Sequence, residues 1–488
     1  MWRREILLAL FIGALSTLAF SPTGFSLLLP VTLAVWLDRI FRQRSGKMAA
    51  GLGFSFGLGF FLAGIAWIYI SLHVYGGMPA PLTGLALFLF SSCLALYWLC
   101  AARLIWHFRE KPALHLLIVP ASLGLMDWLR GTLFTGFPWL SLGYSQIPSG
   151  WFHGFDPLLG IYGVSLIIGL AAALLRLVFV SGWSMKGLAG LGLLILVSLG
   201  INSINYTHAV GSPFSVRLIQ GNIPQSIKWH PEEAIKTLEH YRTLIDASHE
   251  RLVILPETAF PVFSNMLPKS FLSGIATYLR RNNSDLLYGV PEEADGRYYN
   301  SVMSLGVSPS QVYRKRHLVP FGEFVPLKFI FKPVMAWLNI PLDDFNRGSR
   351  EQPPILAAGQ KIAVDVCYED NFGNEIRRSL PQATVLVNVT DDAWFGHVYA
   401  ASQHLQISEA RALETGRYML RATNTGITAI INEHGKLLSE LPPGVTGALI
   451  GNVQGYEGMT PYARFGDILM LILSISMIGV AFIFRTRQ

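Results

Sequence analysis

The sequence predicts a polytopic α-helical membrane domain of about eight spans joined to a single α/β domain. The 488 residues are 51% hydrophobic and 14% charged, with a mean hydropathy of +0.41. This balance is too apolar for a set of soluble domains. Apolar runs long enough for transmembrane helices fill the N-terminal part of the chain and return near the C-terminus. The stretch between them has ordinary globular composition, so it is interpreted as a separate domain.

Eight apolar stretches approach the ~20 residues that a helix needs to cross a bilayer. The first follows a basic start, as in a signal peptide, but it lacks a small-residue cleavage site and further apolar stretches follow at once. We therefore expect a retained helix. The membrane domain is expected over 1–210 and 457–488, and the α/β domain over 211–456. The expected spans are 5–20, 24–38, 50–72, 83–102, 114–129, 157–180, 187–203 and 465–484.

Lysine and arginine lie almost entirely on one side of these spans. With a cytoplasmic N-terminus, thirteen basic residues fall on inside segments, and only Arg130 and Arg464 lie at the edges of outside ones. This asymmetry follows the positive-inside rule. It accounts for the formal net charge of +7, so we expect no nucleic acid partner. With seven spans before it, the α/β domain is expected to face outward, and both termini to be cytoplasmic.

Within the α/β domain, short apolar runs that end at polar residues alternate with helical patterns. The alternation predicts a layered domain with buried strands, and reactive groups in such domains lie just beyond strand ends. Strands are expected at 215–222, 251–258, 285–290, 301–306, 311–317, 361–367, 384–392 and 426–438, the last with a turn at 433–435, and helices at 232–250, 270–282 and 401–423.

Cys367 is the only cysteine in the α/β domain, because Cys93 and Cys100 lie in the fourth span and are interpreted as apolar fillers. It closes the strand "KIAVDVC", and the following "YEDNFGNEIRRSL" places acids first and bases last, as a helix would. A thiol on such a turn is expected to have a lowered pKa and to act as a nucleophile beside N–H groups that can hold an oxyanion. The alternative is an inert buried thiol.

Glu257 and Lys315 also fall at strand ends. A carboxylate there can take a thiol proton and later return one to a leaving group, and a lysine can stabilise a tetrahedral intermediate. Either residue alone could instead be a solvated surface charge. Asp127 and Arg130, three apart at a span end, fit either a functional intramembrane acid or a simple ion pair. His397 and His404 lack a metal-ligand spacing and are interpreted as helix-surface or packing residues.

Together these features resemble the nitrilase, or carbon–nitrogen hydrolase, superfamily, and within it the membrane-bound branch of bacterial apolipoprotein N-acyltransferases. The resemblance covers Val216 to about Val453, and the loop "RGTLFTGFPWLSLGYSQ" (130–146) is also similar. The matching segments are "QGNIPQSIKW" (220–229), "LPETAF" (255–260), "KRHLVPFGEFVP" (315–326), "VCYED" (366–370), "DDAWFG" (391–396) and "RATNTGITAII" (421–431). One departure is Asp391, where the resemblance leads us to expect Asn and a hydrogen bond at the rim of the site.

The resemblance implies an αββα sandwich and a Glu–Lys–Cys triad that needs no metal or cofactor. Cys367 would take an acyl chain from a phospholipid as a thioester and pass it to the α-amino group of a diacylglyceryl-cysteine at the N-terminus of an apolipoprotein. Glu257 would be general base and acid, and Lys315 the oxyanion stabiliser. The expected supporting residues are Glu323, Tyr368 and Glu369, and the expected substrate-binding residues are Trp229, Trp394 and Phe395.

The resemblance further implies a bacterial inner membrane protein with a periplasmic catalytic domain, which we expect to be a monomer. Segments 329–342 and 393–399 are apolar and aromatic, as suits the headgroup boundary. A membrane-anchored amidase that uses water or another amine remains an alternative, because the triad activates the donor and the pocket selects the acceptor. A transporter or sensor would need charges or broken helices deep in the spans, and mid-span charges are nearly absent.

Overall fold

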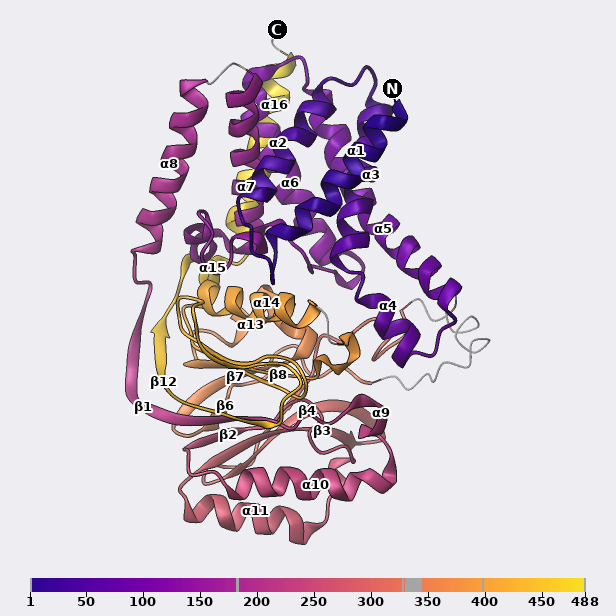
Figure 1. Cartoon of the computed structure of the whole chain (residues 1–488). Coiled ribbons are helices and arrows are strands. Elements are labelled where there is room, and N and C mark those ends of the chain that lie inside the picture. Colours follow the sequence, from indigo (N-terminus) through magenta and orange to yellow (C-terminus); the bar gives the residue numbers. More distant parts are fainter. Residues whose placement is uncertain (1, 181–183, 327–328, 330–344, 397–398, 487–488) are drawn as a thin grey trace. The chain divides into compact units, whose positions relative to one another are not determined.

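The computed structural model describes residues 2–180, 184–326, 329, 345–396 and 399–486. The chain forms two compact units (Figure 1). One comprises Met1–Tyr69, Pro79–Asn205 and Thr460–Gln488, and the other comprises Ile70–Met78 and Tyr206–Met459. We call them the helical unit and the sandwich unit. The segment Ile70–Met78, which falls inside the helical part of the sequence, thus belongs to the sandwich unit.

Six helices among the described residues of the helical unit are long and apolar enough to cross a membrane, fewer than the eight expected. The first two expected spans fall on α1 and α2, which have 15 and 14 residues. At 1.5 Å per residue they are shorter than a ~30 Å hydrocarbon core. The helices are α1 (Trp2–Ser16), α2 (Leu28–Phe41), α3 (Gly46–Gly64), α5 (Ala80–His107), α6 (His115–Thr132), α7 (Asp156–Val180), α8 (Met185–Asn202), α15 (Pro461–Phe465) and α16 (Ile468–Thr486).

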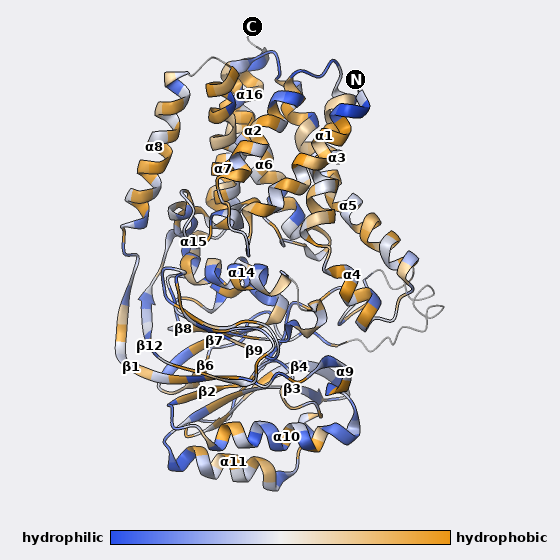
Figure 2. Ribbon diagram, in the orientation of Figure 1, coloured by the Kyte–Doolittle hydropathy of each residue, from blue (hydrophilic) through white to orange (hydrophobic). Residues whose placement is uncertain are grey.

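Apolar residues dominate the long helices of this unit, whereas polar and apolar residues alternate along the helices of the sandwich unit (Figure 2). The two cysteines of α5 are exposed, so they do not fill a core as expected. Close packing of α1 on α3 depends on glycine. A Cβ at Gly13 would lie 2.0 Å from the carbonyl oxygen of Phe56, which leaves no room for a side chain.

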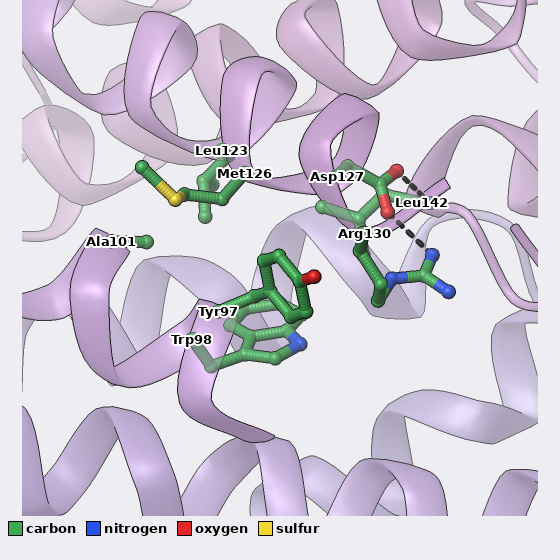
Figure 3. Close-up of a pocket in the computed structure, with 8 residues that line it drawn as sticks. All are labelled: Tyr97, Trp98, Ala101, Leu123, Met126, Asp127, Arg130 and Leu142. Atoms are coloured by element: carbon green, nitrogen blue, oxygen red, sulfur yellow. Dashed lines mark hydrogen bonds and ion pairs between the residues drawn. The ribbon is translucent and has the colours of Figure 1, made fainter. Parts of the chain in front are cut away.

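Asp127 and Arg130 form the buried ion pair that is one of the two interpretations above (Figure 3). Their side chains lie 2.5 Å apart on α6, beside a small cavity that Tyr97 and Met126 also line. Arg130 also donates to the carbonyl of Trp139 at 2.8 Å, and Asp127 accepts from the backbone N–H of Leu142 at 2.9 Å. The pair therefore anchors the loop that follows α6 to the end of the helix.

The sandwich unit contains two six-stranded sheets, ordered β12-β1-β2-β3-β4-β5 and β11-β10-β9-β8-β7-β6. Helices α10 (Pro231–Asp246) and α11 (Lys269–Arg281) cover the first sheet, and α14 (Ala400–Thr415) lies against the second (Figure 1). The predicted αββα sandwich is confirmed. The strands are β1 (Thr207–Gln220), β2 (Leu252–Ile254), β3 (Asp285–Ala294), β4 (Arg297–Gly306), β5 (Val312–Arg314), β6 (Ile355–Ala357), β7 (Gln360–Val366), β8 (Val385–Thr390), β9 (Met419–Thr423), β10 (Thr428–Ile431), β11 (Leu437–Leu441) and β12 (Gly447–Gly458).

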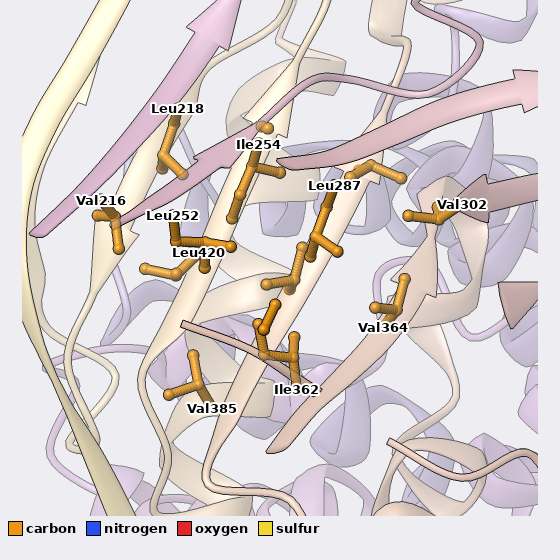
Figure 4. Close-up of a cluster of buried hydrophobic side chains, with 14 of the residues drawn as sticks. Val216, Leu218, Leu252, Ile254, Leu287, Val302, Ile362, Val364, Val385 and Leu420 are labelled. Atoms are coloured by element: carbon orange, nitrogen blue, oxygen red, sulfur yellow. The ribbon is translucent and has the colours of Figure 1, made fainter. Parts of the chain in front are cut away.

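The core of this unit lies between the two sheets (Figure 4). Leu218, Ile254 and Leu287 from the first sheet meet Val364 and Leu420 from the second, and all are buried. A second cluster packs the outer face of the first sheet against α10 and α11. Because strands in the middle of each sheet are covered on both faces, they read as continuous apolar runs, which is the pattern that identified them.

Two expected elements differ in the structure. The helix expected over 401–423 ends at Thr415, because Gly416 has φ +63° and a Cβ there would lie 2.6 Å from Thr207. Left-handed backbone of this kind favours glycine and ends a helix. The last expected residues form β9 instead. After Cys367, only short helical turns appear, over Cys367–Asn371 and Gly373–Ile376, in place of one helix.

Candidate active site

Glu257, Lys315 and Cys367 follow three strands, β2, β5 and β7, and the fold brings them into one buried group. Lys315 Nζ lies 3.4 Å from Glu257 Oε1. The charges of both residues act on the pKa of the Cys367 thiol. All three side chains are buried, so their charges interact through an environment much less polar than water.

The backbone around Glu257 is tightly constrained. Thr258 has φ +45°, and a Cβ at Gly289 on the neighbouring β3 would lie 2.7 Å from the Cα of Glu257. The carboxylate accepts from Asn300 Nδ2 at 2.7 Å and from the backbone N–H of Asp391 at 3.0 Å. Burial raises the pKa of Glu257, the positive charge of Lys315 opposes this, and the net shift is upward. A carboxylate with a raised pKa is a better proton acceptor near neutral pH.

Lys315 lies between two carboxylates. Its Nζ donates to Glu323 Oε1 at 2.9 Å, and Glu323 is fixed in turn by Asn300 and by the backbone N–H of Val319 at 2.8 Å. Burial alone would lower the pKa of Lys315, but the charges of Glu323 and Glu257 outweigh it and raise that pKa. The two carboxylates therefore favour the charged form of Lys315. Glu323 contacts Lys315 directly, and its supporting role stays a prediction.

Cys367 lies at the end of β7 with φ +53°, a conformation that non-glycine residues rarely adopt. The expected lowering of its pKa is wrong. Burial and the negative charge of Glu257 raise the pKa of the thiol above its ordinary value, although Lys315 acts in the opposite direction. The physical reason is that the short turn after Cys367 supplies no full helix dipole, while the site excludes water.

Glu369 joins the strand that leads to Cys367 to the loop that carries Lys315. Its carboxylate accepts from the backbone N–H of Val366 at 2.7 Å and from those of Arg316 and His317 at 2.8 and 3.0 Å. The backbone before Cys367 and the backbone after Lys315 thus donate to one carboxylate, that of Glu369. Tyr368 is buried and makes an edge contact with the ring of His317. Both residues are buried beside Cys367 in the sequence, and their supporting roles stay predictions.

The residues expected to bind substrate differ in exposure. Trp229 and Trp394 are 46% and 43% exposed, and Phe395 is half-buried with its ring near His404. The backbone carbonyl of Trp394 accepts from Ser71 Oγ at 2.7 Å, so the segment from Ile70 to Met78 supports this loop. Most of the expected headgroup-boundary segment 329–342, together with His397, lies outside the described residues.

A second buried network lies behind Cys367, and the sequence interpretation missed it. His404 on α14 lies 2.7 Å from Asp392 and 3.0 Å from Asp370, and its Nε2 is 3.3 Å from the carbonyl oxygen of Cys367. Arg421 pairs with both aspartates at 3.0 and 3.3 Å. Asp370, Asp392 and Arg421 lie in the motifs quoted above. Membership in those motifs was the only signal in the sequence that could have pointed to this network. Of the two interpretations given for His404, surface residue or packing residue, its complete burial fits the second.

The chain matches two family models. One, described as the apolipoprotein N-acyltransferase N-terminal domain, covers residues 12–174, and the other, described as carbon–nitrogen hydrolase, covers residues 215–462. Asp391, where Asn was expected, lies inside the second match. Its backbone N–H, which does not depend on the side chain, donates the hydrogen bond to Glu257.

Whole-chain relatives agree with these matches. A protein named apolipoprotein N-acyltransferase from Nitrosomonas europaea is 46% identical over 96% of this chain and 95% of its own length. One with the same name from Methylococcus capsulatus is 41% identical over 99% and 97%. A carbon–nitrogen hydrolase superfamily protein from Xanthomonas campestris has a TM-score of 0.38 and 20% identity over 50% of this chain and 91% of its own. The chain belongs to the apolipoprotein N-acyltransferase family.

Proposed function

We propose that this membrane enzyme transfers an acyl chain from a phospholipid to the α-amino group of an N-terminal diacylglyceryl-cysteine on an apolipoprotein. The single observation that carries the proposal is the buried contact of Glu257 with Lys315, at 3.4 Å, in the same site as the Cys367 thiol. A carboxylate, an ammonium and a thiol are the base, the oxyanion partner and the nucleophile of covalent acyl transfer. The names of the relatives support the choice of substrates.

In the first half-reaction, Glu257 takes the thiol proton as Cys367 Sγ attacks the carbonyl carbon of a phospholipid ester. The oxyanion that forms is stabilised by Lys315. Collapse of this intermediate breaks the ester bond, and Glu257 returns the proton to the departing lysophospholipid oxygen. The acyl chain is left on Cys367 as a thioester. Each step moves one proton between neighbouring groups and requires no oxidant or reductant.

In the second half-reaction, the α-amino group of the lipoprotein attacks the thioester carbon. Glu257 accepts a proton from the amine, Lys315 again stabilises the oxyanion, and the thiolate of Cys367 departs and regains its proton. The two carboxylates beside Lys315 serve different purposes. Glu257 exchanges protons, whereas Glu323, at 2.9 Å from Lys315 Nζ, keeps the lysine charged and in place throughout.

The test is intact mass of the purified full chain incubated with phospholipid and no acceptor. We expect a mass gain of one acyl chain that neutral hydroxylamine removes and that a diacylglyceryl peptide discharges. Cys367→Ala should show no gain, while a matched variant that lacks Cys93 and Cys100 should acylate normally. Absence of both the adduct and lysophospholipid release from the wild type would overturn the proposal.

We also propose that residues 1–210 and 457–488 form the membrane domain of a monomeric inner membrane protein, with residues 211–456 in the periplasm and both termini in the cytoplasm. The distribution of basic residues supports this orientation. In spheroplasts, a membrane-impermeant thiol reagent should label Lys236→Cys and not Lys47→Cys, both made without Cys93, Cys100 and Cys367. The reverse labelling pattern would contradict the orientation.

A further inference from the structure

Glu257 contacts two residues outside the triad, Lys228 and Asp391, whose side chains form an ion pair. Lys228 Nζ and Asp391 Oδ2 lie 2.5 Å apart, and both side chains are only 3% exposed. Lys228 Nζ also donates to the main-chain carbonyl of Glu257 at 3.2 Å, and the backbone N–H of Asp391 donates to Glu257 Oε2 at 3.0 Å. The three residues thus form a closed ring of contacts around the general base.

This ring connects loops that are distant in sequence. Lys228 ends the short helix α9 (Gln225–Lys228), and Asp391 follows β8. Asn424, after β9, donates to both oxygens of Asp391 at 3.1 Å and to the carbonyl of Ile223 at 2.8 Å. The Asp391 carboxylate is therefore bonded to a cation and an amide, and this leaves its backbone N–H aimed at Glu257.

We propose that in this chain Lys228 and Asp391 are positioning residues for Glu257, and that the carboxylate of Asp391, at the position where the resemblance leads us to expect Asn, balances the charge of Lys228 beside the base. The inference rests on the proposed role of Glu257 as general base. An unpaired charge at either position would shift the proton affinity of a buried carboxylate strongly, because a charge within a few ångströms of a titrating group moves its pKa by about 1–3 units. The pair supplies hydrogen bonds to the base while adding no net charge.

Other charged groups also face Glu257, and they stay constant in the test below. Burial is the largest cause that raises the pKa of Glu257; Glu323 and Asp391 raise it further, and Lys315 lowers it. The titratable and charged groups that surround the ring are Lys315 and Glu323 after β5, Cys367 after β7, Lys228 on α9, Asp391 after β8 and Tyr241 on α10, which faces Asp391.

Removing each charge separately should have opposite effects. Asp391→Asn keeps the backbone N–H that binds Glu257 but leaves the Lys228 ammonium unbalanced, so the pKa of Glu257 falls. The acid limb of the pH–rate profile should then move down by about 1 unit or more, with a slower plateau, because the base is weaker. Lys228→Met leaves the Asp391 carboxylate unbalanced, so the same limb should move up by a similar amount.

The measurement is the rate of acyl-enzyme formation on Cys367 from phospholipid, by intact mass, between pH 5 and 9 on the full chain. The double variant of Lys228→Met and Asp391→Asn should return the limb to within about 0.3 unit of wild type. Lys236→Met, which removes a 71% exposed lysine from α10, is the matched control and should change nothing.

Limbs that move in the same direction, or not at all, in the two single variants would overturn the inference, since a merely structural pair would slow both variants without opposite shifts. If a single variant does not fold, the double variant decides. A displaced limb refutes charge balance, and a restored limb supports it. A wild type that never acylates would instead refute the proposed function, so the two failures are distinguishable.

Discussion

His404 should make the sandwich unit less stable as the pH rises from 6 to 9. Its imidazole lies between Asp392 and Asp370, at 2.7 and 3.0 Å, with no exposed surface. Burial and the charge of Arg421 would lower the pKa of His404. The two aspartates outweigh them and raise that pKa from 6.5 to about 9. His404 is therefore charged at neutral pH and donates from both ring nitrogens.

The sign and size of this pH effect on stability follow from the difference between the folded and unfolded pKa of His404. The pKa of about 9 in the folded protein lies above the unfolded value of 6.5, so the contribution is complete below pH 6.5 and is lost as the pH rises through 9. A difference of about 2.5 units corresponds to about 3 kcal/mol in the free energy of unfolding. For a unit of this size, about 3 kcal/mol corresponds to about 6–12 °C in Tm.

The assay is thermal unfolding of the full chain in detergent at one scan rate, from pH 6 to 9.5, for wild type and His404→Gln. The variant should be less stable at pH 6, and the two curves should converge near pH 9.5. Glu409 titrates in the same range, because burial and the charge of Glu440 raise its pKa to about 8, but its effect is common to both proteins. Parallel curves would refute the charged state of His404.

Two further predictions follow from single buried carboxylates. Glu369→Gln puts an amide opposite three backbone N–H donors, so we expect acyl-enzyme formation to slow by about 10–100-fold while phospholipid binding to the variant, measured separately, stays constant. Unchanged acylation would contradict its positioning role. Asp127→Asn leaves Arg130 unpaired within the helical unit, and it should lower the free energy of unfolding by about 3 kcal/mol or more. A Tm within about 1 °C of wild type, which corresponds to about 0.3 kcal/mol, would contradict this reasoning.

Much of the fold could be predicted because burial leaves a direct mark on sequence. Strands β3, β7 and β8 are covered on both faces and appear as apolar runs that end at polar residues. The element β12 (Gly447–Gly458) was not predicted, because glycines at 447, 451 and 455 interrupt its apolar residues and its partner β1 lies more than 200 residues away. The helix boundary at Gly416 did carry a local signal, a glycine directly after the helical run, which the prediction over 401–423 passed over.

The site was predictable in part for the same reason. Residues at the ends of predicted strands, such as Glu257, could be chosen as reactive groups because sheets gather their strand ends. Asn300 in the middle of β4 and Lys228 on α9 could not be chosen, since each contacts Glu257 only through the folding of distant segments. The direction of the pKa shift at Cys367 also depends on burial, which a strand-end position does not reveal.

A protonated resting thiol is compatible with catalysis because the site conserves its charge during attack. In the proposed mechanism, the proton moves from Cys367 to Glu257 while a negative charge appears on the carbonyl oxygen beside Lys315. The buried group therefore gains no net charge, and the desolvation that disfavours a free thiolate does not oppose the coupled transfer. In the resting protein, by contrast, the charge of Glu257 raises the pKa of the thiol, and that of Lys315 lowers it.

One variant can separate the role of Glu257 as proton acceptor from the effect of its negative charge on the thiol of Cys367. Glu257→Gln removes the proton acceptor, so acylation by phospholipid should fall by about 100-fold or more. The same change removes a negative charge beside Cys367, so the pKa of the thiol should fall and alkylation by iodoacetamide at pH 8 should become faster, by about 10-fold for each unit. Lys315→Met should slow alkylation. If Glu257→Gln slowed both reactions, Glu257 would be activating the thiol before substrate arrives, and the charge-conserving attack would be wrong.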